Sequence, residues 1–481
     1  MIGLPNRAPV VATSPLPLNK LTALSPLDGR YQSKCARLRH FFSEFALMHA
    51  RVKVEVEWLL HLSAQRGIKE VPAFAAGDMK FLRELAERFS MLDAARIKEY
   101  DNKINHDVKA VEYFIKEKIG ARKSQALSKC GEFVHFACTS EDINNLAYAL
   151  LMKNAREKIV LPQMRALIDT VRALAKRHAK QPMLARTHGQ PASPTTVGKE
   201  FANFAARFAR AHDDFAALPM LGKLNGASGN FNAHLAAYPK LNWERIAATF
   251  VCRRLKLEYQ PMSTQIEPHD HLAALCDGLR RFNTIALDLD RDMWGYISLG
   301  YFRRKVKGEI ESSAMPHKIN PIEFENSEGN IGVANALLQH FSEKLPVSRW
   351  QRDLSDSTVL RNLGVAVGHS MLALEESVKG LSKLGLEKDR IDDDLENNWE
   401  VLAEAVQTVM RRHGVKWAYE ELGKLMRGGA TRDEFRAFIE ALEIPEEAKR
   451  RLLEMTPANY TGRAAEAAAK WSAGATSMRR G

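Results

Sequence analysis

The segment from Glu311 to Asn320 combines side chains that transfer protons with side chains that bind anions. Its sequence is ESSAMPHKIN: two serines stand beside a Met-Pro, and a His-Lys pair and an Asn-Pro follow. It is too polar for a buried core, and its composition is not that of a plain linker. Because functional side chains are often carried on loops between rigid elements, this segment is the first candidate for chemistry.

Five further segments place polar residues where the surrounding helical pattern pauses. Guanidinium groups and hydroxyls together are suited to hold phosphate oxygens. The segment RWQRDLSDSTVLRN combines both kinds of group and therefore indicates either a phosphate site or a solvated charged face. The segments hold Arg30 and Tyr31 in SPLDGRYQ, Asn105, His106 and Asp107 in NHDVKAVEYF, Thr139 and Ser140 in HFACTSEDINN, His188 in LARTHGQPASPTT, and Arg352, Ser357, Thr358 and Arg361 in RWQRDLSDSTVLRN.

Simpler structural roles compete for several of these residues. Asn105 and Asp107 can be helix N-caps. So can Thr139, with Asp142 three residues on, or Ser140, with Ile143 three residues on; the two pairs give alternative cap registers. A cap explains one hydroxyl of the pair at 139–140 but not the whole polar set. A lone histidine in a loop, such as His188, is more often solvated or hydrogen-bonded than catalytic.

Composition narrows the classes of partner. The formal charge of +12 is spread over 481 residues, with Lys and Arg interleaved with acidic residues. Nucleic acid is therefore the least favoured partner, whereas small multi-anionic substrates fit. The five scattered cysteines form no C-x-x-C, which argues against a disulfide framework or metal site and fits a reducing cytoplasm. The sequence contains no run of about 18 or more apolar residues, so it predicts no membrane span.

Long amphipathic helices must position the polar segments. Apolar residues recur at steps of three and four over 143–174, 201–215, 272–293, 331–345 and 360–378. The pattern predicts an all-α fold with a flexible arm at 1–20, an N-terminal helical domain at 21–129, a central bundle of long helices at 130–383 and a C-terminal helical domain at 384–481. A helix of about 30 residues spans roughly 45 Å, and helices that long with broad apolar faces favour a homo-oligomer.

The stretch SSAMPHKINP resembles the signature S-S-x-M-P-x-K-x-N-P of the fumarase/aspartase superfamily. The resemblance implies three helical domains, a homotetramer built around a central helical bundle, and an elimination that releases fumarate. The segments above, together with TQIEPHD, resemble most the longer bacterial form of one branch of this superfamily. That branch catalyses two cleavages. One converts adenylosuccinate to AMP, and the other converts SAICAR, a succinylated aminoimidazole ribotide, to AICAR. That branch belongs to purine nucleotide biosynthesis and needs no metal or organic cofactor.

The resemblance also implies roles for single residues, in sites assembled from three subunits. A β-elimination removes a carbon-bound proton beside a carboxylate, protonates the leaving amine and stabilises the developing charge. By the family pattern Ser312 is the general base and His188 the general acid. The implied substrate-binding residues are Lys318, Asn320, Thr139, Ser140 and Gln265 around the succinyl group, Asn105, His106 and Asp107 beside the base, and Arg30, Tyr31, Asn326, Arg352, Ser357, Thr358 and Arg361 around the nucleotide.

One residue departs from the family pattern, and three other interpretations stay open. Glu311 stands where the family loop commonly has glycine, which adds a negative charge and removes backbone freedom. A related lyase acting on argininosuccinate or aspartate is the nearest alternative, although the Arg/Ser segment argues against it. A non-enzymatic binding or structural protein on the same scaffold is a second alternative, and nucleic-acid binding is the weakest.

Overall fold

The structure is a computed structural model that describes residues 16–304, 315, 319–426 and 431–473. Helices dominate these residues, which confirms the predicted all-α class. The strands are short and form three two-stranded sheets: β1 (Pro182–Thr187) with β2 (Gln190–Thr196), β3 (Leu221–Gly222) with β4 (Glu258–Tyr259), and β5 (Phe302–Arg304) with β6 (Leu384–Leu386). Within the described ranges, no helix is both long enough and apolar enough to cross a bilayer.

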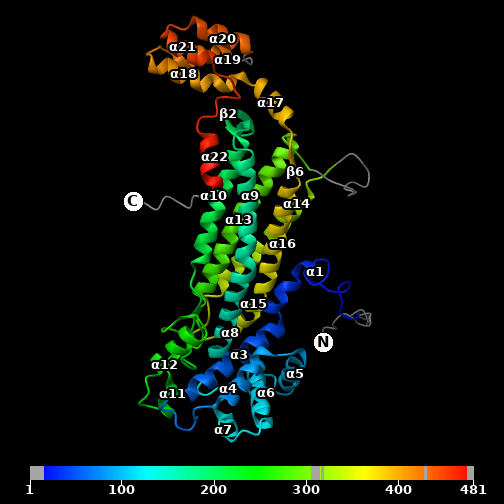
Figure 1. The fold of residues 1–481 in the computed structure, drawn as a ribbon, viewed down its shortest axis with the longest axis vertical. Helices are drawn as coiled ribbons and strands as arrows, with labels where there is room; N and C mark the ends of the chain where they lie inside the picture. Colours follow the sequence, from blue (N-terminus) through cyan, green and yellow to red (C-terminus); the bar gives the residue numbers. More distant parts are fainter. Residues whose placement is uncertain (1–15, 305–314, 316–318, 427–430, 474–481) are drawn as a thin grey trace, which may run out of the picture.

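Five long helices run side by side along the molecule (Figure 1). Each buries a broad apolar face; the predicted phenylalanine stripe at 201–215, for example, is buried in α10. Burial of such stripes stabilises long helices more than their intrinsic propensity does. The five are α9 (Leu161–Arg177), α10 (Val197–Ala216), α13 (Asp270–Ser298), α14 (Ile322–Lys344) and α16 (Leu363–Ser382).

The first predicted stripe is confirmed as a single rod, whereas the last one differs from the helices observed. The stripe at 143–174 is one continuous rod, because α8 (Ser140–Ala155) passes through a π-helical turn at Arg156–Val160 into α9. Pro162 lacks an N–H, and it lies in the first turn after the π-helical segment, where no intrahelical donor is needed. The stripe at 360–378 is interrupted instead, since α15 (Ser355–Leu360) ends before α16 begins.

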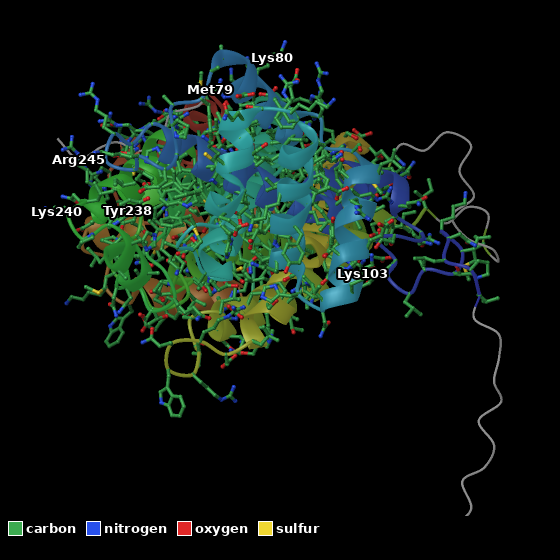
Figure 2. The ribbon with its side chains drawn as sticks, turned by 90° about the horizontal axis from the view of Figure 1, so that it is seen from below. Met79, Lys80, Lys103, Tyr238, Lys240 and Arg245 are labelled. Carbon is green, nitrogen blue, oxygen red and sulfur yellow. The ribbon has the colours of Figure 1, made fainter. Side chains whose placement is uncertain are left out.

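The two ends of the bundle carry different helices (Figure 1). Figure 2 looks onto the lower end, where exposed cations such as Lys80, Lys103 and Arg245 point outward. The helices that lie at the lower end, or that lead into it along the chain, are α1 (Gln32–Cys35), α2 (Arg39–Phe42), α3 (Glu44–Ser63), α4 (Ala76–Glu87), α5 (Met91–Ile104), α6 (Asp107–Ala121), α7 (Gln125–Lys129), α11 (Asn232–Ala237) and α12 (Trp243–Thr249).

The upper end has its own small core around Trp399, Leu402 and Phe435. The last helix, α22 (Ala464–Ser472), returns to pack on α9 and α10. The domain boundaries expected at 129/130 and 383/384 stay predictions. The helices at this end are α17 (Lys388–Glu396), α18 (Ala403–Arg412), α19 (Ala418–Met426), α20 (Arg432–Ala441) and α21 (Glu446–Leu453).

Candidate active site

The N-terminus of α8 is the centre of the polar residues at the lower end. Thr139 is the N-cap of this helix, and its backbone N–H donates to Asp142 Oδ2 at 2.8 Å, so the first of the two cap registers considered is confirmed and the one that starts at Ser140 is wrong. Ser140 begins the helix, and both hydroxyl residues are half-buried. A helix N-terminus favours anions because its first N–H groups lack intrahelical acceptors. The position of both hydroxyls suits a carboxylate of a substrate.

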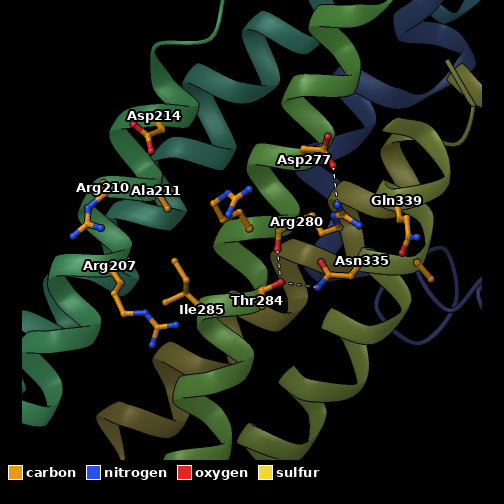
Figure 3. Close-up of a pocket in the computed structure, with 12 residues that line it drawn as sticks. Arg207, Arg210, Ala211, Asp214, Asp277, Arg280, Thr284, Ile285, Asn335 and Gln339 are labelled. Carbon is orange, nitrogen blue, oxygen red and sulfur yellow. Dashed lines mark hydrogen bonds and ion pairs between the residues drawn. The ribbon is translucent and has the colours of Figure 1, made fainter. Parts of the chain in front are cut away.

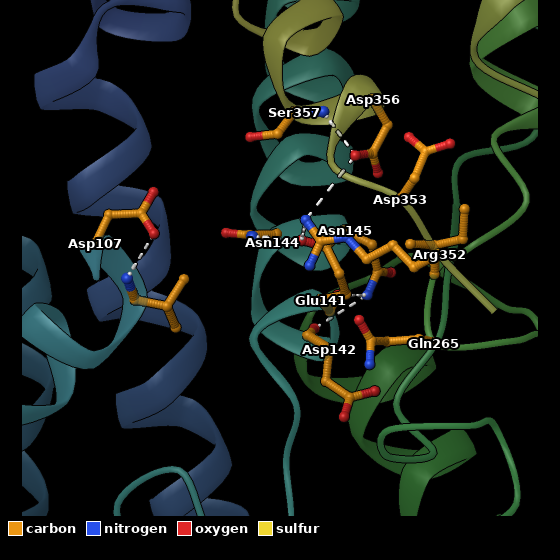
Figure 4. Close-up of polar contacts among 12 residues, drawn as sticks. Asp107, Glu141, Asp142, Asn144, Asn145, Gln265, Arg352, Asp353, Asp356 and Ser357 are labelled. Carbon is orange, nitrogen blue, oxygen red and sulfur yellow. Dashed lines mark hydrogen bonds and ion pairs between the residues drawn. The ribbon is translucent and has the colours of Figure 1, made fainter. Parts of the chain in front are cut away.

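Glu141 connects this helix to the arginine-rich segment (Figure 4). It is buried, and its carboxylate lies 2.9 Å from Arg352 Nη2 and accepts a hydrogen bond of 2.6 Å from Asn144 Nδ2. Arg352 also lies 3.9 Å from Asp356, whose Oδ1 accepts a hydrogen bond of 2.7 Å from the Ser357 N–H. Two carboxylates therefore hold the Arg352 guanidinium in place.

Asp107 joins the second predicted segment to the same cluster. Its Oδ2 lies 2.8 Å from Arg51 Nη2 and 3.1 Å from Arg361 Nη2, and Arg51 Nε donates to Asn144 Oδ1 at 2.8 Å. Burial opposes the charged carboxylate, but the two guanidiniums hold the pKa of Asp107 below its ordinary value. Arg361 also donates to the Ser357 hydroxyl. The structure thus brings Asp107, Ser357 and Arg361 together.

The neighbours of Asp107 have different roles from those considered in the sequence. Asn105 ends α5 in the left-handed conformation with φ 52°. His106, not Asn105 or Asp107, is the N-cap of α6, and its Nδ1 accepts from the Lys109 N–H at 3.1 Å. The N-cap alternative was therefore wrong for Asn105 and Asp107, because the chain turns one residue later than the Asn would require. His106 and Asn105 are both exposed.

Gln265 and the segment at 30–31 flank this cluster. Gln265 donates to the Ala227 carbonyl at 3.3 Å, and the adjacent Thr264 hydroxyl donates to the Gln351 carbonyl at 2.9 Å. Arg30 lies 6.0 Å from the ring centroid of Tyr31. A cavity of about 350 Å³ between the segment at 25–43 and α16 is bordered by Arg361. Arg30 and Tyr31 therefore belong to a segment that faces Arg361 across this cavity, although neither residue lines it, and Gln265 lies next to the contact between Thr264 and Gln351.

A buried ion pair fixes the first turn of α8 from below. Lys223 Nζ lies 2.9 Å from Asp142 Oδ1, and both side chains are 0% exposed. The same carboxylate accepts from the backbone N–H groups of Asn225, at 3.0 Å, and Gly226, at 3.1 Å. Removing one member of such a pair leaves an uncompensated charge in the core.

We expect Asp142→Ala to lower the free energy of unfolding by about 3–5 kcal/mol, because Lys223 would keep its charge without a partner. Urea unfolding of the purified chain measures the loss. The matched control is Asp169→Ala. The Asp169 carboxylate is 61% exposed and lies 3.8 Å from Arg172, so this substitution breaks an exposed pair. An equal effect of the two substitutions would contradict the role assigned to the buried pair.

His135 supports the segment that leads into Thr139. Its Nδ1 lies 2.6 Å from Glu55 Oε1, and its backbone N–H donates to Glu55 Oε2 at 3.1 Å. Burial opposes the charged ring, but the Glu55 carboxylate raises the pKa of His135 above its ordinary value. The stabilisation is thus complete below the unfolded-state pKa of about 6.5 and is lost as the pH rises through the higher folded-state pKa.

We therefore expect His135→Gln to destabilise the chain more at pH 6 than at pH 9. Urea unfolding of wild type and variant at both pH values gives the difference. A loss of equal size at the two pH values would show that protonation of His135 contributes nothing to stability.

His188 lies at the opposite end of the molecule, at the tip of the β1–β2 hairpin (Figure 1). Thr187 pairs with Gln190, so His188 and Gly189 form a two-residue turn with φ 54° and 77°. Positive φ at both positions is typical of the turn type that fits twisted hairpins. His188 is exposed and makes no hydrogen bond to another described residue. The Gly/Pro-rich break in the sequence is thus a rigid hairpin that presents an imidazole.

The rod formed by α8 and α9 separates the two regions. It runs from Ser140 to Arg177, roughly 55 Å at about 1.5 Å per residue, and the hairpin follows at its far end. His188 of one chain therefore cannot meet Thr139 or Arg361 of the same chain.

Of the segment at 311–320, the structure describes Met315, Ile319 and Asn320. Ser312, Lys318 and Glu311 lie outside the described residues. Asn320 is half-buried, and its carbonyl accepts from the guanidinium of Arg304. Asn326 lies in the first turns of α14, where its Oδ1 accepts from Asn330 Nδ2 at 2.6 Å. Thr358 is exposed on α15, where its carbonyl accepts from Asn362.

Arg51 and Asn144 are members of the cluster that the sequence analysis missed. Arg51 is 2% exposed in the centre of α3, a helix buried almost all round. Arg51 and Lys53 both stand in this apolar run, but only Arg51 is buried, and a buried arginine needs acidic or amide partners. Such a cation predicts that partners exist but does not identify them.

A cavity lies elsewhere, on the side of the bundle (Figure 3). It has a volume of about 760 Å³ between α10, α13 and α14. Arg207, Arg210 and Arg280 line it together with Asp277 and Asn335, and none of the predicted site residues does. Among the described residues, no group of three or more His, Cys, Asp or Glu side chains is arranged to hold a metal ion.

Comparisons with known proteins agree on one family. The family profile described as Lyase matches residues 29–336, and the profile described as Adenylosuccinate lyase C-terminal matches residues 348–461. The adenylosuccinate lyase of Escherichia coli K12 is 55% identical over 93% of this chain and 98% of that protein. That of Haemophilus influenzae is 53% identical over 95% of this chain and 100% of that protein.

Solved structures share the fold at lower identity. A fumarate lyase from Mesorhizobium sp. BNC1 has a TM-score of 0.72 at 19% identity and covers 91% of this chain and 98% of its own. A 3-carboxy-cis,cis-muconate lactonizing enzyme from Pseudomonas putida has a TM-score of 0.72 at 20% identity, over 91% of this chain and 96% of its own. These two likenesses concern the fold alone.

Proposed function

Because the chain belongs to the adenylosuccinate lyases of the fumarase/aspartase superfamily, we propose that it eliminates fumarate from adenylosuccinate to give AMP and from SAICAR to give AICAR. It is a carbon–nitrogen lyase of purine nucleotide biosynthesis. The observation that carries this function is the identity of 53–55% to adenylosuccinate lyases over almost the whole chain. The geometry of the site supports separate roles for its residues in proton transfer, carboxylate binding and phosphate binding.

His188 donates a proton to the leaving nitrogen, and Ser312 removes the proton from the carbon beside the succinyl carboxylate. The support for His188 is its exposed place at a rigid turn, from which the imidazole reaches outward without a competing partner among the described residues. A serine hydroxyl is a weak base, so we assign to Lys318, six residues further along the chain, the role of stabilising the charged form. Lys318 and Asn320 hold the succinyl carboxylates, together with Thr139, Ser140 and Gln265.

The phosphate binds beside Arg361, with Ser357 and Thr358 as hydroxyl donors. Arg352 is already held by Glu141 and Asp356, and its charge is largely matched, so it serves chiefly to orient the cluster. Arg361 is exposed; its Nη2 contacts one carboxylate, that of Asp107, and its Nη1 donates to Ser357, so Arg361 and the Ser357 hydroxyl offer phosphate a guanidinium and a hydroxyl side by side. Arg30, Tyr31 and Asn326 complete the nucleotide pocket, while Asn105, His106 and Asp107 border it.

Each active site is shared between copies of the chain in a homotetramer. The support is the separation of roughly 55 Å between the His188 hairpin and the start of α8, which a single copy cannot close. Apolar side chains left uncovered in the isolated chain, such as Trp350 at 98% exposure and Leu24, also suit contact with a second copy. The arginine-lined cavity on the bundle side is a further surface for such a contact.

The enzyme acts in the cytoplasm. All five cysteines are free, which fits a reducing compartment.

An absorbance assay tests the proposed function. Purified chain is mixed with adenylosuccinate, and the ultraviolet change on conversion to AMP is followed; turnover of SAICAR is measured in parallel. Turnover of argininosuccinate or aspartate, with none of adenylosuccinate, would overturn the substrate assignment. The absence of any lyase activity in a correctly assembled tetramer would favour reuse of the scaffold for binding.

A further inference from the structure

Asp394, in α17 near the upper end, contacts two segments that are far apart in the sequence. Its Oδ2 lies 2.6 Å from Arg186 Nη2 and also accepts a hydrogen bond from the hydroxyl of Tyr301. The Asp394 side chain is 15% exposed, and Tyr301 is buried. One carboxylate oxygen thus connects the β1–β2 hairpin with the residue that immediately precedes β5.

Arg186 is close to the catalytic turn. It stands two residues before His188 and pairs with Pro191 across the hairpin, next to the Thr187–Gln190 pair that closes the turn. Because the turn has only two residues, fixing Arg186 also fixes the direction in which His188 points. The exposed tip offers no other anchor among the described residues, since His188 itself makes no hydrogen bond there.

Two further contacts hold the hairpin, one to α18 and one to α17. The Ser193 hydroxyl donates to Glu404 in α18, and Gln181 Nε2 donates to Asp392 in α17 at 3.4 Å. Asp394 is the anchor nearest to the tip on β1. The helices α17 and α18 therefore support the hairpin through Asp392, Asp394 and Glu404; we call these two helices the platform.

Tyr301 brings a second segment to the platform. Its carbonyl accepts from the Glu387 N–H at 2.9 Å, next to the start of α17, and β5 follows it directly. Burial, and then the neighbouring Asp394 carboxylate, raises the pKa of Tyr301 to about 12, so its hydroxyl remains a donor at neutral pH. The carboxylate of Asp394 therefore keeps both of its partners across the physiological range.

We propose that Asp394 is a positioning residue for the lyase reaction, which acts through Arg186 to aim His188 and through Tyr301 to fix the start of β5. The proposal rests on the acid role assigned to His188 in the proposed function. It assigns to the C-terminal helices a part in catalysis at the hairpin tip, although Asp394 touches neither substrate nor the reacting atoms.

The first test is Asp394→Asn, with Asp393→Asn as the matched control. Asp393 is the exposed neighbour in the same helix. We expect Asp394→Asn to lower kcat about 10- to 100-fold, the size of effect that follows when a catalytic group is displaced by about 1 Å. The KM for adenylosuccinate stays within about twofold, because the binding cluster lies at the other end of the chain. The control keeps both constants.

A second test separates positioning from general stability. In a background that carries Arg186→Gln and Tyr301→Phe, adding Asp394→Asn is expected to cost nothing further in kcat, since its partners are already gone. Asp394→Glu, which keeps the carboxylate, restores part of the rate. If Asp394→Asn melts too low for assay, Tyr301→Phe alone, which removes one hydroxyl, is expected to lower kcat at unchanged KM.

The outcomes distinguish the two proposals. An inactive His188→Ala beside a fully active Asp394→Asn would overturn the positioning role and leave the proposed function intact. A fully active His188→Ala would overturn the acid assignment itself. A multiplicative loss in the triple variant would show that Asp394 acts on the enzyme by another route.

Discussion

Replacing His188 with alanine is expected to lower kcat by about 10²–10⁴-fold, the range typical for loss of a general acid or base. The amine that leaves adenylosuccinate must gain a proton as the carbon–nitrogen bond breaks. The structure holds His188 on a two-residue turn with its ring exposed, so removal of the imidazole leaves the hairpin in place. The KM for adenylosuccinate is expected to change little, because binding rests on the cluster around Arg361.

Chemical rescue makes this prediction sharper. Because the hairpin tip is exposed, added imidazole is expected to enter the space left in His188→Ala and restore part of the rate. The control is His340→Ala, which removes an exposed histidine of α14 and keeps wild-type activity. A His188→Ala variant with full activity, or one with a raised KM and unchanged kcat, would contradict the acid role.

Mixing two defective variants is expected to restore activity. His188→Ala damages the upper end of each chain, and Arg361→Ala damages the lower end by removing the phosphate contact. If one site takes His188 and Arg361 from different copies, random tetramers contain sites in which both residues are wild type. About a quarter of the sites qualify when the two variants are equally abundant, since each position is intact with a chance of about one half.

The experiment uses co-expression of the two chains with different affinity tags, followed by isolation of the mixed tetramers. Activity is measured at a low adenylosuccinate concentration, where Arg361→Ala alone is nearly silent. The matched control mixes Arg361→Ala with Ser357→Ala; the two residues contact each other in one chain, so no site regains both. Mixed tetramers no more active than their parents would show that one copy supplies a complete site.

The amino-acid sequence by itself determined the features that depend on near neighbours. The three- and four-residue spacing of apolar side chains predicted α10, α13 and α14, because helix periodicity is a local property. The cap formed by Thr139 and Asp142 was predicted for the same reason. The reaction class followed from the resemblance of the stretch SSAMPHKINP to a family signature, which can be compared because its residues are consecutive in the chain.

Only the tertiary structure decided how distant residues meet. Asp107 contacts Arg51, 56 positions away, and Arg361, 254 positions away; no local pattern relates these residues. The break between α15 and α16 and the continuous rod across Pro162 also depended on packing, which overrides local preference. The rod in turn placed His188 roughly 55 Å from Thr139, which stands at the other end of the rod. Helix length and packing direction therefore determined that the acid and the binding cluster of one chain lie apart.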